Sequence, residues 1–428
     1  MKKFNIGAVV AGFIVAVLAV TSVSLPTTAA GLDPYQLVSV NNTGNGQGGD
    51  GHSQYPLMSA NGRYVVFKSA ATNLVNSDTN GVADVFRRDI KTNTTIRVSV
   101  SSAGVQANAQ SDPWAISENG RYMTYTTAAT TLEGGSTPYA LTYLHDAQTG
   151  TNTVIKKTGW NNSLIDMRSI SNDGRFVIGT ATPPLLDVNG VNVSGPRAFI
   201  YEVATNTFTR IAPTVSGNEQ QAGEGDVRAS CDGSIAVFAS HSTDLVSATD
   251  TNGTTADVFI VDLRTGYKIT NITHAFNGPS TVPRISCNGN YVVFESTASN
   301  VPGAPTIDTS YFGDRHLYQY DRLSGEFALA DQGMDSNSNP AYNPNLWGVT
   351  DDGKVLFDAL LTSSSATRAY VIRNVEDATT EFINTGAARI PALGVDKAGK
   401  KIVISSSRSD LVSSDTNART DVFVSQVN

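Results

Sequence analysis

SANGRYVVFKSAATNLVNSDTNGVADVFRRDIKTNTTIRVSV, residues 59–100, is the stretch that decides the fold of this chain. Its β-branched and aromatic runs alternate with turn residues, and no apolar period of about 3.6 residues intervenes, so the stretch predicts strands rather than helices. Together with the residues just before it, the stretch predicts one unit of four strands. These strands are expected at residues 55–59, 63–69, 84–89 and 94–100.

The opening phrase, a turn around a glycine, returns six more times along the chain. The glycines, 46 to 64 residues apart, are Gly62, Gly120, Gly174, Gly233, Gly289, Gly353 and Gly399. Copies at such a period indicate a repeat fold with insertions in its loops. Four antiparallel strands per copy are typical of a propeller blade, so we predict an all-β fold, a seven-bladed β-propeller. We expect each glycine to adopt positive φ, and the polar residue three positions earlier to form an Asx- or Ser/Thr-turn.

The two ends of the chain complement each other. The seventh copy supplies strands at about 390–395, 401–405 and 421–425 and lacks a fourth strand. YQLVSVNNTGNGQG, which begins at Tyr35, resembles IRVSVSSAGVQAN, the fourth strand and exit loop of the first copy. We therefore expect the N-terminal strand to complete the last blade and close the ring, which leaves only short sheet edges unpaired.

The first thirty residues predict a secretory signal peptide. Two lysines precede an apolar run from about Ile6 to Leu25, and residues 28–30 offer small side chains for cleavage. An uncleaved N-terminal anchor is the alternative, because the apolar run is long for a signal peptide. We expect residues 31–428 to form a single propeller domain outside the cytoplasm, whether secreted, periplasmic or at the cell surface.

Composition and charge exclude some classes of partner. The chain of 428 residues is 40 % hydrophobic, which allows a large core. Its net charge of -8 argues against nucleic acid or an anionic membrane surface as the main partner. We expect a monomer that touches a membrane only through an uncleaved signal segment.

The two cysteines of the chain, Cys231 and Cys287, occupy the same position in consecutive repeats, within RASCDG and RISCNG. In an oxidising compartment such a pair suggests a disulfide that ties neighbouring blades near the axis. The alternative is that two small residues each fill a turn independently.

The repeats resemble a known family. The phrase S-x-D/N-G-R-Y-V-V-F, the strand that opens with D-V-F and the D-x-x-T-G turn at 262–266 are similar to the TolB-type, WD-repeat-like (PD-type) propeller repeat. The resemblance covers residues 35–428. It implies the propeller fold, in proteins that serve as binding platforms, as accessory domains of peptidases and occasionally as lyases. TolB itself carries an additional N-terminal domain, whereas here the propeller directly follows the predicted signal.

Three loops between the second and third strands share an aspartate, an asparagine two residues later and an aspartate that opens the third strand. They contain Asp78, Asn80 and Asp84, then Asp250, Asn252 and Asp257, then Asp415, Asn417 and Asp421. Such oxygen side chains can bind calcium, and the pattern is similar to the calcium loops of integrin-type propellers, although a first aspartate of that family is replaced here. Calcium would be structural. The alternative is a pair of Asx-turns whose final aspartate binds loop amides, and we expect no other cofactor.

The central channel offers a second candidate site. The residues four positions before each turn glycine are apolar, and we expect them in the core. Strand alternation turns the preceding residues toward the axis. These are Leu57, Ala115, Ser169, Arg228, Arg284, Gly348 and Gly394. Arg228 and Arg284 lie on adjacent blades and can hold a carboxylate or a phosphate, unless they are merely tolerated in a wet channel.

The loop face is the third candidate. The loops between blades and those between second and third strands leave on one side of a propeller, and here both kinds are long. The aromatic residues in these loops that can stack on sugar rings or anchor a peptide are Trp160, Tyr311, Phe312 and Tyr342. Trp114 and Trp347 share one repeat position and are expected to pack between blades.

No linear motif predicts an enzyme. The five histidines show no metal-ligand spacing, and no nucleophile elbow or phosphate loop is present. We expect no catalytic residues and favour a binding or scaffold module for a protein or glycan ligand. The alternatives are a secreted polysaccharide lyase or hydrolase with a site at the channel mouth, and a calcium-dependent adhesion module. An enzyme would gather titratable groups from several blades within about 7 Å of one point.

Overall fold

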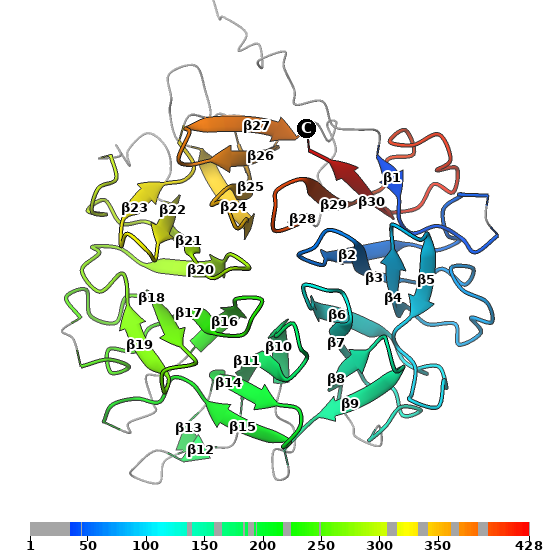
Figure 1. Ribbon diagram of the computed structural model, residues 1–428, viewed down its shortest axis with the longest axis horizontal. Coiled ribbons are helices and arrows are strands. Elements are labelled where there is room, and N and C mark those ends of the chain that lie inside the picture. The colour runs from blue at the N-terminus through cyan, green and yellow to red at the C-terminus, as the bar shows by residue number, and fades with distance from the viewer. Residues whose placement is uncertain are drawn as a thin grey trace, which may run out of the picture.

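The structure, a computed structural model, is a ring of seven four-stranded antiparallel sheets around a central axis (Figure 1). The prediction of an all-β, seven-bladed propeller is confirmed. The predicted signal segment, residues 1–30, lies outside the described residues. The structure describes residues 35–427 except 44, 135–138, 158–164, 183–184, 187–191, 194, 217–223, 248–249, 306–314, 333–340, 361–367 and 384–392.

Within these ranges, no helix has the length and hydropathy needed to cross a lipid bilayer.

Each blade runs outward from its inner strand. Blades 1 and 2 are β2 (Ser53–Met58), β3 (Tyr64–Ser69), β4 (Asp84–Asp89), β5 (Thr94–Arg97), and β6 (Ser111–Ile116), β7 (Tyr122–Thr127), β8 (Leu141–Asp146), β9 (Thr151–Ile155). Blades 3 and 4 are β10 (Ile165–Ile170), β11 (Phe176–Ala181), β14 (Arg197–Glu202), β15 (Thr207–Arg210), and β16 (Glu224–Ala229), β17 (Ile235–Ser240), β18 (Asp257–Asp262), β19 (Lys268–Asn271). Blades 5 and 6 are β20 (Ser280–Ile285), β21 (Tyr291–Ser296), β22 (His316–Asp321), β23 (Phe327–Leu329), and β24 (Tyr342–Val349), β25 (Val355–Leu360), β26 (Arg368–Asn374), β27 (Thr379–Ile383). Blade 7 is β28 (Leu393–Val395), β29 (Lys401–Ser406), β30 (Asp421–Gln426) and β1 (Gln36–Leu37), while β12 (Leu185–Leu186) and β13 (Asn192–Val193) pair in a loop of blade 3.

Most predicted boundaries agree with the structure. In blade 1 the third strand has the predicted bounds, whereas the fourth ends at Arg97 instead of residue 100. The strand ends there because the amide of Val85 donates to the side-chain Oγ of Ser99, at 3.0 Å, and not to a backbone carbonyl of the fourth strand.

The N-terminal strand closes the ring, as predicted. β1 pairs with β30, with Gln36 opposite Val424 and Leu37 opposite Phe423. Beyond the strand, the amide of Val38 donates to the carbonyl of Val422 at 2.8 Å. Figure 1 shows β1, in blue, beside β30, in red. The first and last described strands of the chain therefore form one sheet.

The apolar core lies mainly between neighbouring blades. Val65 and Phe67 of blade 1, for example, pack in one buried cluster with Val403 and Val422 of blade 7. Within several blades an aromatic residue of the second strand also stacks on its cross-strand partner in the third. These stacked pairs are Phe67–Phe86, Tyr125–Tyr143, Phe238–Phe259 and Phe294–Tyr318. Such pairs explain why the repeated phrase ends in an aromatic residue.

The repeated phrase forms the turn between the first and second strands. All seven turn glycines have φ between +67° and +80°, which a side chain would strain. In the first copy the amide of Tyr64 donates to Oγ of Ser59 at 2.9 Å, the predicted Ser/Thr-turn. Arg63 also forms an ion pair of 2.6 Å with Asp89 at the end of the third strand. The repeated phrase therefore builds the turn between the first and second strands, and residues outside the phrase have to carry the function.

Candidate functional site

The inner strands surround the axis, and six of the seven contain a β-bulge. A bulge leaves a residue without a partner on the next strand and redirects its side chain. In each of these strands the residue six positions before the turn glycine is unpaired. These residues are Pro56, Trp114, Arg168, Val227, Pro283 and Trp347. Strict strand alternation therefore fails at the axis.

A cavity of about 770 Å³ lies on the axis and receives side chains from all seven blades. The residues five positions before the glycines line it, as strand alternation predicts. The residues four positions before the glycines also line it, so the expectation that they belong only to the core is wrong. They form an apolar ring of Met58, Ile116, Ile170, Ala229, Ile285, Val349 and Val395. This ring does not depend on the bulge, because Gly394 and Val395 both line the cavity in blade 7, whose inner strand pairs without a register shift.

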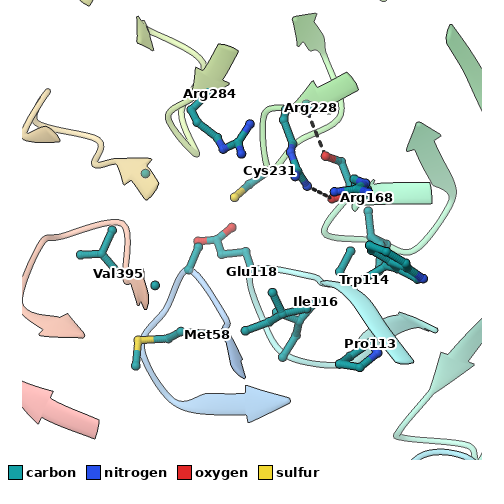
Figure 2. Close-up of a pocket in the computed structure, with 18 of the residues that line it drawn as sticks. Met58, Pro113, Trp114, Ile116, Glu118, Arg168, Arg228, Cys231, Arg284 and Val395 are labelled. Atoms are coloured by element: carbon teal, nitrogen blue, oxygen red, sulfur yellow. Dashed lines mark hydrogen bonds between the residues drawn. The ribbon is translucent and has the colours of Figure 1, made fainter. Parts of the chain in front are cut away.

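The predicted arginines converge, and a carboxylate lies between them. Asp226 of β16 forms ion pairs of 2.8 Å with Arg228 and 2.5 Å with Arg284. A third arginine, Arg168 of β10, lies 3.8 Å from Asp226 and 2.7 Å from Asp166. Figure 2 shows the three arginines together at one side of the cavity. The anion that these arginines hold is thus a side chain of the protein itself.

The arginines outnumber the carboxylates in this cluster. Burial opposes ionisation of Asp226, but the charges of Arg228, Arg284 and Arg168 outweigh it, so the pKa of Asp226 lies below its ordinary value. Burial, with the nearby charge of Arg284, lowers the pKa of Arg228 to about 10, which still leaves it protonated at neutral pH. Three guanidinium groups against the carboxylates of Asp226 and Asp166 leave one positive charge (3 − 2 = 1).

Aromatic side chains flank the cluster. The guanidinium of Arg168 lies over the ring of Trp114 at 4.5 Å, a cation–π contact between blades 3 and 2. Trp347 donates from Nε1 to Asp358 at 2.6 Å. Both tryptophans line the cavity as well as packing between blades. Tyr55, at the bulge of β2, also lines it, with 56 % of its surface exposed and a φ of 54°.

One of the four predicted loop aromatics belongs to the described residues. Trp160, Tyr311 and Phe312 lie outside the described residues. Tyr342 is the first residue of β24 rather than a loop residue, and its side chain is half-buried.

The turns between first and second strands form a closed ring at the other end of the cavity. Hydrogen bonds link the turns of successive blades. Some join backbone atoms, as from Lys397 to Ala60 at 2.9 Å and from Cys231 to Cys287 at 2.8 Å. Others use a side chain, as from Asn288 Nδ2 to the carbonyl of Asp351 at 2.9 Å. Lys397 and Glu118 form an ion pair across the turn of blade 1, and Glu118 points toward the middle of the ring (Figure 2). Ala60, Glu118 and Cys231 line this end of the cavity.

Cys231 and Cys287 form a disulfide between blades 4 and 5, with Cα atoms 4.7 Å apart. The Glu118 carboxylate lies within 4.8 Å of both sulfur atoms. Because both sulfurs are already bonded to each other, this cluster does not offer thiolate ligands to a metal.

The three aspartate loops lie in blades 1, 4 and 7, so their residues form separate clusters. In each, the final aspartate is almost fully buried at the start of the third strand. It accepts a hydrogen bond from the asparagine of its own loop. The donor–acceptor pairs are Asn80–Asp84, Asn252–Asp257 and Asn417–Asp421. In each loop, therefore, the asparagine side chain holds the final aspartate in place.

Sequence reasoning missed Arg168, Asp226 and Trp114. They stand six or seven positions before their turn glycines, and their places at the axis depend on the bulge. The signal that was available is the charged and aromatic residues at these positions, such as Asp226 and Arg228 flanking Val227.

Together, the repeated phrase and the ring of blades define the class: this chain is a seven-bladed β-propeller. Among solved structures it is similar to a putative TolB from Agrobacterium tumefaciens, at 18 % identity over 65 % of this chain and 79 % of that chain, with a TM-score of 0.38. It is also similar to TolB from Acinetobacter baumannii, at 16 % identity over 81 % of this chain and 67 % of that chain, with a TM-score of 0.40.

A prolyl endopeptidase, one of two analysed for the role of inter-domain dynamics in catalysis and specificity, matches at 10 % identity over 87 % of this chain, with a TM-score of 0.53. The match covers 50 % of the endopeptidase chain, and it shows the propeller fold alone. No protein-family model matches the sequence. No curated protein matches it either.

Proposed function

We propose that this propeller is an extracytoplasmic binding or scaffold module that holds a protein or glycan ligand on its long-loop face, at the mouth of the axial cavity. The observation that carries the proposal is the cavity itself. All seven blades line it, and it presents an arginine cluster, the ring of Trp114 against that cluster and the exposed side chain of Tyr55. Charge-assisted hydrogen bonds from arginine and stacking on tryptophan or tyrosine are the usual means of holding acidic sugars and acidic peptides. An acidic ligand therefore suits this site best.

The proposed location outside the cytoplasm has two supports. One is the charged and apolar pattern of residues 1–30. The other is the disulfide between blades 4 and 5, because disulfides persist in oxidising compartments.

A polysaccharide lyase or hydrolase at the channel mouth is the second candidate. Acids and arginines from blades 3, 4 and 5 converge there, as such an enzyme requires. However, three arginines keep Asp226 ionised, which makes it a poor proton donor at neutral pH. Among the described residues that line the cavity there is no histidine to serve instead.

The test is a binding screen with matched variants. Neutral and uronic-acid oligosaccharides and acidic peptides are titrated into the protein, with tryptophan fluorescence as the readout. We expect Arg284→Met to weaken binding of an acidic ligand about tenfold or more, the loss of one charge-assisted contact. The control is Arg264→Met, which removes an exposed ion pair with Asp232 on the opposite face and should leave affinity unchanged.

Equal effects of the two substitutions would overturn the placement of the ligand at the cavity. Chain shortening or unsaturated products during the titration would instead favour the enzyme.

A further inference from the structure

The aspartate loops of blades 1, 4 and 7 are built alike, which allows one to be compared with another inside a single chain. In each, the final aspartate also accepts a hydrogen bond from a hydroxyl just beyond the blade's fourth strand. These contacts are Ser99–Asp84 at 2.5 Å, Thr273–Asp257 at 2.6 Å and Ser39–Asp421 at 2.6 Å. All these donors are neutral, so none of them balances the charge of the buried carboxylate.

Blade 1 carries its own counter-charge. Arg97, the last residue of β5, places a guanidinium nitrogen 3.3 Å from Asp78 and another 3.7 Å from Asp84. Its side chain is 6 % exposed, and those of the two aspartates are 3 % and 0 % exposed. A cation therefore lies between the first and last aspartates of this loop.

The residue at the place of Arg97 is different in the other two blades. Arg97 lies opposite Phe86 in blade 1, Asn271 lies opposite Phe259 in blade 4, and Leu37 lies opposite Phe423 in blade 7. Blade 7 thus has an apolar side chain where blade 1 has a guanidinium. The two aspartates of blade 7 are retained all the same.

The carboxylate pair of blade 7 has no charge partner in the described part of the chain. Asp415 is 4 % exposed, and neither of its carboxylate oxygens has a hydrogen bond of good geometry within the described residues. Burial raises the pKa of Asp415, and only the backbone amide of Asn417 opposes that shift. Asp421 is fully buried, and burial together with the charge of Asp415 raises its pKa to about 6. The nearby His52 accepts a hydrogen bond at Nδ1 from the amide of Thr420, which does not need a protonated ring. A buried carboxylate without a partner is costly, so this loop calls for a cation.

We propose that the loop of blade 7 binds a hard divalent cation of the calcium class between Asp415 and Asp421, at the place that the guanidinium of Arg97 takes in blade 1. Carboxylate and carbonyl oxygens are the ligands that calcium prefers. The site would also secure the ring closure. Asn417 bridges the loop to the N-terminal segment by donating to the carbonyl of Gly49 at 2.8 Å, and Ser39 binds Asp421 from the same segment.

The cation site of blade 7 does not depend on any ligand on the long-loop face. Thermal unfolding of the purified protein tests for it directly. Tm is measured in chelator and in rising concentrations of calcium, with magnesium in parallel. We expect a saturable rise of several degrees with calcium, because a ligand that binds only the native state stabilises it by mass action. An unchanged Tm at millimolar calcium would overturn the proposal.

Asp415→Asn separates a metal ligand from an ordinary turn residue. For a ligand, the substitution should raise Tm in chelator, since a buried negative charge is removed, and should abolish the response to calcium. A purely structural aspartate would instead give the same loss of Tm in both conditions, and that outcome would contradict the site.

Arg97→Leu provides the converse test in blade 1. This substitution recreates the composition of blade 7, so we expect a second response to calcium that Asp78→Asn then removes. In the otherwise unchanged protein, Asp78→Asn should leave the calcium response intact. If Asp78→Asn alone abolishes that response, the cation belongs to blade 1 and the assignment to blade 7 is wrong.

Discussion

Asp226 shows how a single residue can define a site. It is a non-glycine residue with a φ of 47°, and its carboxylate meets arginines from three blades. Backbone strain of this kind persists where the surrounding contacts outweigh it, and it concentrates at functional sites. The carboxylate occupies the place that an acidic group of a ligand would take. A ligand at this site must therefore either displace Asp226 or bind to the remaining positive charge beside it.

Asp226→Asn should uncover the anion site. Asparagine tolerates the left-handed backbone, so the effect comes from charge rather than from strain. We expect a loss of roughly 2–3 kcal/mol in the free energy of unfolding, somewhat below that for a fully buried pair. Sulfate or citrate should restore more stability to the variant than it adds to the unchanged protein. Urea unfolding with and without the anion measures both effects.

The control for this substitution is Asp232→Asn in the same blade, which breaks an exposed ion pair and should change stability by less than about 1 kcal/mol. Equal losses from Asp226→Asn and Asp232→Asn would show that the cluster contributes no more than a surface pair.

His145 gives the stability of the fold a pH dependence. It is buried in β8, and burial, with the charge of Arg87 nearby, lowers its pKa to about 4. The native side chain stays neutral while the unfolded one binds a proton below about pH 6.5. This contribution to stability is therefore complete above pH 6.5 and is lost as the pH falls toward 4, up to about 3 kcal/mol.

His145→Gln should remove that part of the pH dependence. The difference in unfolding free energy between the unchanged protein and the variant is measured in urea at pH 7 and at pH 4.5. We expect the unchanged protein to lose more stability than the variant between pH 7 and pH 4.5. A constant difference would mean that the native histidine titrates normally.

At the scale of elements, β1 is the decisive strand, because it supplies the outer edge of the last blade from the other end of the chain. Leu37 and Val38 are buried, and Ser39 binds Asp421 through its hydroxyl. Without this strand, β30 would present unpaired backbone groups and an exposed apolar face.

Deleting residues 1–43 should therefore yield a protein that aggregates, whereas deleting residues 1–34 leaves β1 in place and serves as the control. Size-exclusion chromatography and thermal unfolding report the outcome. A synthetic peptide of residues 35–43 added in excess should restore a soluble monomer to the shorter protein. If the shorter protein is already a stable monomer, β1 is not needed for closure.

The elements also show what sequence could predict. Turn glycines such as Gly62 and the strand order of the blades depend on local backbone preferences and a repeat period, and both are visible in one chain. The likeness between the segments that begin at Tyr35 and at Ile96, which predicts the ring closure, was visible for the same reason. The bulges were not, because a bulge is a property of two paired strands. Arg168 and Asp226 reach the axis through bulges, so the arginine cluster was predicted only in its regular members, Arg228 and Arg284.

At the scale of the whole molecule, the disulfide constrains the ring covalently. It closes a loop of 56 residues between blades 4 and 5. Removing a loop constraint of that size costs about 4 kcal/mol in the chain-entropy model. We expect the double variant Cys231→Ala, Cys287→Ala to lose stability of this order in urea unfolding. A reductant should lower the stability of the unchanged protein but not that of the variant, and equal sensitivity would contradict this account.

Blades 4 and 5, which the disulfide joins, lie across the axis from β1 and β30 (Figure 1). The ring is therefore held by one covalent link, the disulfide, and by one strand pairing that joins the two ends of the chain. Opening the pairing between β1 and β30 alone does not part blades 1 and 7, because their side chains also share one buried apolar cluster. The covalent link therefore keeps blades 4 and 5 together whichever other contact of the ring breaks.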